Sequence, residues 1–132
     1  IAGDGELRIE IEQLIHQLDI SNEVFLLGRR NDISKLMSAC DVFVLSSDYE
    51  GLPTVLIEAM ACQAHVVSTD VSGAHEIINN YGEVVQVNNS AKLAVAINNR
   101  MHNLDKNLDG CMFVNKKFDL NTIADKWIEL YR

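Results

Sequence analysis

Two glutamates eight positions apart, Glu50 and Glu58, bracket the part of this sequence whose residue types best suit chemistry. Glu58 stands in an otherwise apolar run, residues 55–62, and a run that is apolar on all sides predicts a buried helix. Carboxylates are rarely buried without a partner, and no basic residue lies within one helical turn of Glu58. We therefore expect its partner to come from elsewhere in the fold or to be a ligand.

The residues between the two acids predict an anion site. A polar loop at 46–51 follows an apolar strand pattern, and Pro53 suits the first turn of a helix. A helix that begins near Leu52 or Pro53 would leave the N–H groups of residues 51, 52, 54 and 55 free, with the positive end of the helix dipole behind them. Such an end suits a phosphate or diphosphate, and Gly51 lets it approach the backbone. The two carboxylates suit sugar or ribose hydroxyls instead, because they only accept hydrogen bonds when ionised.

Each of these features also has a simpler interpretation, which the sequence leaves open. Glu58 could be a surface charge on a less buried helix, and Glu50 could merely favour the positive helix end. The segment 51–53 could be only a turn and a helix start. Arg29 and Arg30 could be solvated loop cations.

The apolar pattern predicts the elements that position this segment. Strands are expected at 24–28, 42–46, 65–69 and 83–87, and helices at 5–18, 32–39, 53–62, 74–79, 90–104 and 121–131. Expected helix caps are Asp32, Ser90 and Asn121. The stretch 103–118 is polar, and no element is predicted for it. Short apolar strands that alternate with helices are typical of an α/β fold with a doubly wound, Rossmann-like parallel sheet.

In such sheets, ligands bind at the carboxyl ends of the strands. Gly28 with Arg29 and Arg30 follows the first expected strand, residues 46–51 follow the second, and residues 69–73 follow the third. We therefore expect these three segments to line one edge, with both arginines near the loop that carries Glu50.

At this point the sequence resembles a known family. The two glutamates, followed by residues 59–62, resemble the signature of the C-terminal, nucleotide-sugar-binding domain of retaining glycosyltransferases of the GT-B fold, family 4. Further blocks match in the family's order, at 1–8, 24–28, 38–44, 66–70, 72–73 and 76–78. The family usually has Gly where Gln63 stands, Pro where His65 stands and a second Gly where Ser72 stands.

The resemblance implies a role for each candidate site residue. Glu50, our candidate catalytic residue, would bind donor-sugar hydroxyls, and Glu58 would bind ribose hydroxyls. The segment after the first expected strand, Gly28, Arg29 and Arg30, would contact the base largely through its backbone. The helix start, Gly51, Leu52, Pro53 and Thr54, would hold the diphosphate or the sugar through the backbone amides of its residues other than Pro53.

The resemblance also implies a reaction and partners. We expect residues 1–132 to be one domain, a fragment without its first strand and without the N-terminal acceptor domain. The parent protein would move a sugar from a nucleotide-diphospho-sugar to an acceptor glycan or lipid-linked glycan, with no cofactor and no metal, and the fragment alone would be inactive. A binding-only domain and a GT-B-fold nucleotide-sugar epimerase are the alternatives.

Composition restricts the remaining possibilities. The chain has 132 residues, a net charge of −8 and a pI near 4.8, which argues against nucleic acid as a partner. Three cysteines without CxxC spacing argue against a disulfide framework or a zinc site and favour a reducing, cytoplasmic setting, at the inner face of the membrane if the parent associates with it. The sequence contains no run of 18 apolar residues, so no membrane span is predicted.

Overall fold

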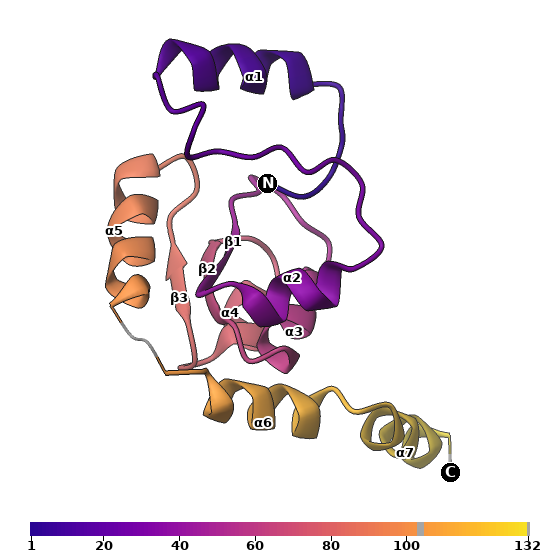
Figure 1. The fold of residues 1–132 in the computed structure, drawn as a ribbon. Coiled ribbons are helices and arrows are strands. Elements are labelled where there is room, and N and C mark those ends of the chain that lie inside the picture. The colour runs from indigo at the N-terminus through magenta and orange to yellow at the C-terminus, as the bar shows by residue number, and fades with distance from the viewer. Residues whose placement is uncertain (103–104, 132) are drawn as a thin grey trace. The chain divides into compact units, whose positions relative to one another are not determined.

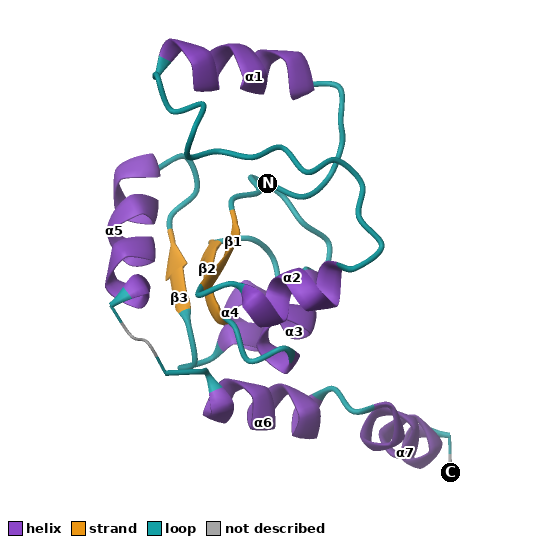
Figure 2. Cartoon of the chain, viewed as in Figure 1, coloured by secondary structure: helices purple, strands orange, loops and turns teal. Residues whose placement is uncertain are grey.

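The computed structural model describes residues 1–102 and 105–131 of the chain. It divides into two compact units, Ile1–Ile33 and Ser34–Arg132. Helices and parallel strands alternate along the second unit, so the expected α/β class is confirmed (Figures 1 and 2).

The first unit holds one helix, α1 (Arg8–Gln17), and an isolated antiparallel bridge between Gly3 and Gly28. The backbone amide of Gly3 donates to the carbonyl of Gly28 at 2.8 Å, and that of Leu27 donates to Ile1 at 2.8 Å. Two such bonds do not make a strand ladder, and Phe25 and Leu27 keep exposed side chains. The prediction of a strand at 24–28 is therefore wrong.

The second unit is built on a parallel sheet in the order β1 (Val42–Leu45), β2 (His65–Thr69), β3 (Glu83–Val85). Val42 is in register with His65, and Val67 with Glu83. Every residue of β2 is buried, as expected for the central strand of a sheet covered on both faces. The strands predicted at 42–46, 65–69 and 83–87 are confirmed, although the first ends one residue earlier and the last two residues earlier than predicted.

Helices cover both faces of this sheet. The crossovers α3 (Thr54–Ala61) and α4 (Ala74–Ile78) each join neighbouring strands in the same direction along the sheet, so right-handed connections place both on one face. The next helix, α5 (Ser90–Met101), lies against all three strands on the other side (Figure 1). The largest wholly buried side chains come from α3, α4 and β2: Leu56, Met60, Ile77, Ile78, Val66 and Val67.

A short helix, α2 (Ile33–Ala39), precedes the sheet, and two helices follow α5: α6 (Leu108–Lys117) and α7 (Leu120–Leu130). Helix α6 was not predicted; it packs on α3 and buries Gly110 and Val114. Residues 103–104, the end of the helix expected at 90–104, lie outside the described residues. None of the helices described is long and apolar enough to cross a membrane.

Two of the three expected helix caps are wrong, and the cap expected at Asp32 stays a prediction. The side chain of Asn89, not Ser90, caps α5 by accepting from the amide of Lys92 at 3.0 Å. Likewise Asp119, not Asn121, caps α7. Both observed caps are the polar residue just before the helix, which is the preferred N-cap type.

Candidate functional site

Two loops meet at the carboxyl edge of the sheet. Thr69, the last residue of β2, is only 5% exposed, and its hydroxyl donates to the backbone carbonyl of Ser47 and, at 3.3 Å, to that of Leu45. The loop after β1 is therefore held against the end of β2. This agrees with the expectation that residues 46–51 and 69–73 share one edge.

Glu50 has a defined partner within its own loop. The hydroxyl of Ser47 donates to Oε1 of Glu50 at 2.7 Å. Glu50 is half-buried, whereas its neighbours Tyr49 and Gly51 are exposed. The carboxylate is thus fixed just ahead of α3. Neither Ser47 nor Thr69 was singled out from the sequence; the available signal was a hydroxyl three residues before the glutamate and another at the end of the adjacent strand.

The second loop touches the start of α3 through a glycine. Gly73 has φ of +80°, in the left-handed region that favours glycine. A Cβ atom at Gly73 would lie 3.1 Å from Cδ1 of Leu52 and 3.5 Å from Cδ of Pro53. The loop after β2 therefore packs directly on the residues that precede α3.

The start of α3 differs in one respect from the predicted anion cradle. Pro53, with φ of −77° and ψ of 72°, forms an inverse γ-turn in which the amide of Thr54 donates to the carbonyl of Leu52 at 2.8 Å. The expectation that the Thr54 amide is free is therefore wrong. The amides of Gly51, Leu52 and Val55 donate to no backbone carbonyl within the described ranges, and no side chain caps the helix.

Glu58 is exposed, so the expectation that it is buried is wrong. At 3.6 residues per turn, Leu56, Ala59 and Met60 share the buried side of α3 and Glu58 points away from it. The apolar neighbours Val55 and Ile57 made the helix look buried all round, but each is only half-buried. The exposure of Glu58 does not test whether it binds ribose hydroxyls, so that role stays a prediction.

The arginines predicted to contact the nucleotide base belong to the first unit. Gly28 has φ of +63° and begins the turn that carries them. Arg30 is tied to Asp32, the expected cap of the next helix, by its Nε at 2.8 Å and its Nη2 at 2.7 Å. This hydrogen-bonded pair raises the pKa of Arg30 and lowers the pKa of Asp32. That Arg29 and Arg30 lie near the Glu50 loop stays a prediction.

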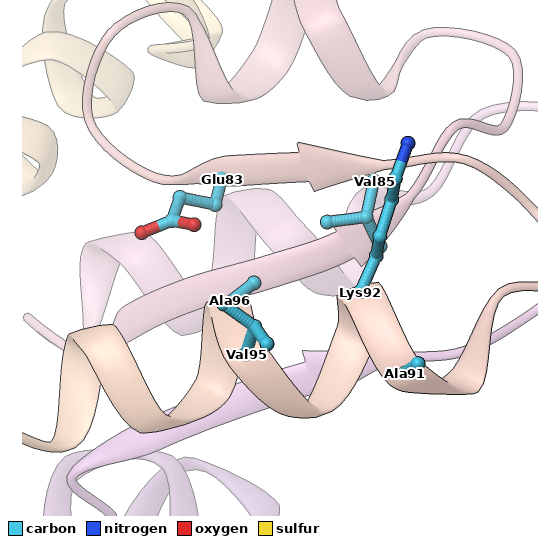
Figure 3. Close-up of a pocket in the computed structure, with 6 residues that line it drawn as sticks. All are labelled: Glu83, Val85, Ala91, Lys92, Val95 and Ala96. Atoms are coloured by element: carbon cyan, nitrogen blue, oxygen red, sulfur yellow. The ribbon is translucent and has the colours of Figure 1, made fainter.

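A shallow hollow of about 330 Å³ lies elsewhere in the second unit, between β3 and α5 (Figure 3). Its lining is mostly aliphatic and shares no residue with the Glu50 loop: Glu83, Val85, Ala91, Lys92, Val95 and Ala96. Across the described part of the chain, no group of three or more His, Cys, Asp or Glu residues is placed to hold a metal ion.

The parallel α/β sheet has the Rossmann-like architecture of one half of a GT-B glycosyltransferase, the class of the solved structures that share its fold. The match to known families agrees with this class. Residues 1–109 match the family described as Glycosyl transferases group 1, and the chain belongs to this family.

Curated relatives share this part of their sequence with the chain. An N-acetylgalactosamine-N,N'-diacetylbacillosaminyl-diphospho-undecaprenol 4-alpha-N-acetylgalactosaminyltransferase from Campylobacter jejuni is 41% identical over 92 residues, which are 67% of this chain and 25% of that protein. The GPI3 subunit of the phosphatidylinositol N-acetylglucosaminyltransferase of Saccharomyces cerevisiae is 29% identical over 138 residues, covering 99% of this chain and 30% of that subunit. The chain thus spans about a quarter of the length of such relatives.

Solved structures share the fold. HepE of Anabaena, in complex with UDP and glucose, superposes with a TM-score of 0.89 at 30% identity, covering 98% of this chain and 39% of HepE. A HepE complex with UDP-glucose gives a TM-score of 0.85. The sucrose-phosphate synthase of Thermosynechococcus elongatus gives 0.85 at 28% identity, covering 97% of this chain and 34% of the synthase.

Proposed function

We propose that this chain is the donor-binding part of a retaining glycosyltransferase, which moves a sugar from a nucleotide-diphospho-sugar to an acceptor hydroxyl. One observation carries the proposal: the uncapped start of α3, with the free amides of Gly51 and Leu52, lies next to a glutamate held by Ser47. The binding of UDP and UDP-glucose by HepE, which has the same fold, supports it.

The parts of the donor can be assigned to the groups that suit them. The amides of Gly51, Leu52 and Val55 and the positive end of α3 would bind the diphosphate. Glu50 would accept from sugar hydroxyls, and Glu58 from ribose hydroxyls. The turn after Gly28 would contact the base through its backbone.

Charge explains why the diphosphate needs a local site. The chain carries a net charge of −8, so its overall field repels an anionic donor, whereas the start of α3 offers partial positive charge at this edge. Backbone N–H groups that are already in place before the reaction stabilise the leaving diphosphate without having to reorganise. We therefore propose transfer without a metal ion or cofactor, in which this domain positions the donor and a second domain binds the acceptor. A cytoplasmic reaction fits a nucleotide-sugar donor.

Titration of the ¹⁵N-labelled chain with UDP and then UDP-glucose tests the binding proposal. The amide signals of Gly51, Leu52 and Val55 should shift on addition of either ligand, because the diphosphate would accept from these groups. The amide of Gly110, inside α6, should not move and serves as the internal reference. A titration in which the signals of the α3 start stay unchanged up to millimolar UDP would refute the proposed site and favour a binding-only domain for another partner.

Transfer itself must be tested on the full-length protein. Incubation with a nucleotide sugar and an acceptor glycan should give a product whose anomeric configuration matches that of the donor, with activity retained in EDTA. Incubation with the donor alone separates the epimerase alternative, because only an epimerase would convert the sugar without an acceptor. An inverted product would contradict the retaining mechanism.

A further inference from the structure

Three hydrogen bonds link the centre of the sheet to the candidate catalytic carboxylate. Thr69 donates from the end of β2 to the carbonyls of Leu45 and Ser47, and Ser47 donates from its side chain to Oε1 of Glu50 at 2.7 Å. The first residue is buried in the central strand and the last lies on the loop ahead of α3. The position of Glu50 is thus coupled to the buried central strand of the sheet.

The pattern of donors leaves Glu50 able to bind a ligand. An ionised carboxylate has about four acceptor positions, and Ser47 uses one on Oε1. The remaining positions, including both on Oε2, can accept from hydroxyl groups of a sugar. A glutamate side chain otherwise samples many rotamers, so a hydroxyl that holds it before the donor arrives removes part of the entropy cost of binding.

Thr69 acts on Glu50 indirectly, through Ser47. Its hydroxyl fixes the backbone of Ser47, so that the serine side chain starts from a defined place. A valine at position 69 would keep the shape of threonine but lose this hydroxyl, whereas a serine would keep it. The two substitutions therefore separate the hydrogen bond from the packing.

We propose that Ser47, supported by Thr69, is a positioning residue for Glu50 and that it makes the site discriminate the intact nucleotide sugar from the nucleotide alone. This inference rests on the proposed function, because it takes Glu50 to contact the sugar. Ser47 itself touches no ligand in this scheme. Its effect should therefore appear only when a sugar is present.

Calorimetry with UDP and UDP-glucose tests the inference on the chain and its variants. Ser47→Ala should weaken UDP-glucose binding about 3- to 10-fold, the loss expected for one hydrogen bond, and leave UDP binding within about twofold. Ser47→Thr should restore the affinity for UDP-glucose, and Thr69→Val should lower it while Thr69→Ser does not. Ser46→Ala is the matched control, because Ser46 is exposed and precedes the residue under test.

The outcomes distinguish this inference from the function on which it rests. Equal losses of UDP and UDP-glucose affinity in Ser47→Ala, or the same effect in Ser46→Ala, would overturn the inference alone. Failure of the unsubstituted chain to bind either ligand would overturn the proposed function and the inference with it.

A second measurement needs no ligand. Scalar couplings that report χ1 and χ2 of Glu50 should show one dominant rotamer in the unsubstituted chain and averaged values in Ser47→Ala. Averaged couplings in both proteins would show that Ser47 does not hold the carboxylate. If Glu50 keeps a single rotamer in Thr69→Val, Thr69 does not help to position Glu50.

Discussion

Gly73 and Leu52 hold the two site loops together: a Cβ atom at Gly73 would lie 3.1 Å from Cδ1 of Leu52. That separation is tighter than ordinary van der Waals contact, so a side chain at position 73 would have to displace Leu52 in addition to straining the left-handed backbone. The exposed Leu52 side chain thereby covers the turn at Gly73. The packing of these two residues joins the sheet edge to the helix end that would bind the diphosphate.

Replacing Gly73 by alanine should therefore cost both stability and ligand affinity. The left-handed φ of +80° disfavours alanine by about 1–2 kcal/mol, and the new methyl group would push Leu52 away from the α3 start. Urea unfolding should show this loss, and UDP titration should show weaker binding. For stability, Gly51→Ala is the matched control, because a Cβ atom there would meet nothing within 4 Å. Equal stability of the two variants would contradict the packing argument.

Gln63 is a site where a glycine should stabilise the chain. It has φ of +65° directly after α3, and the amides of Gln63 and Ala64 donate back to Met60 and Ala59 at 2.9 and 3.1 Å, which is the Schellman arrangement that favours glycine. Gln63→Gly should raise the free energy of unfolding by about 0.5–1 kcal/mol.

The control for this gain is a glycine within a helix. Gln13→Gly, in the interior of α1, should lower stability by about 1 kcal/mol because the helical φ there suits any residue. Thermal unfolding of both variants should show a gain of stability in Gln63→Gly and a loss in Gln13→Gly, each relative to the unsubstituted chain. A loss of stability in Gln63→Gly would show that the glutamine side chain contributes more than its backbone strain costs.

The sequence predicts the sheet well because β1, β2 and β3 are short apolar runs bounded by turn residues. The same pattern fails at 24–28, because an apolar run becomes a strand only where a neighbour offers a ladder, and here residues 1–3 supply a single bridge. Helix α6 was missed because its buried face consists of Gly110 and Val114, too little apolar periodicity to stand out.

The candidate site was predictable in its chemistry but not in its details. The order of residues around Glu50 indicates a polar loop before a helix, which the structure confirms. The engaged amide of Thr54 depends on the ψ angle of Pro53, which no residue pattern specifies. The exposure of Glu58 depends on which side of α3 meets the sheet, and apolar residues on all sides leave that choice to packing.

Asn107 should be the most sensitive of the capping residues. It is 8% exposed, accepts from the amide of Gly110 at 3.1 Å and donates to the carbonyl of Tyr81 at 2.9 Å. Asn107→Ala should lower the free energy of unfolding by about 2–4 kcal/mol, since it removes a cap and leaves buried carbonyls without a donor. Asp119→Ala, which removes an exposed cap, should cost only about 1 kcal/mol in the same urea experiment. Similar losses in the two variants would show that burial of Asn107 adds nothing.

Glu58→Ala should weaken nucleotide binding without affecting the fold. Because Glu58 is exposed on the outer side of α3, its truncation should change stability by no more than about 0.5 kcal/mol. Loss of a charge-assisted hydrogen bond to ribose should lower UDP affinity by about 1–3 kcal/mol.

Comparison of UDP with 2′-deoxy-UDP makes the ribose role of Glu58 specific. If the carboxylate accepts from the ribose hydroxyls, the deoxy ligand already lacks one partner, so Glu58→Ala should reduce its affinity less than that of UDP. Glu129→Ala, which removes an exposed carboxylate from α7, controls for the change in net charge and should leave both affinities unchanged. Equal losses for the two ligands in Glu58→Ala would mean that Glu58 acts through its charge or through another part of the nucleotide, because a bond to the missing hydroxyl must distinguish them.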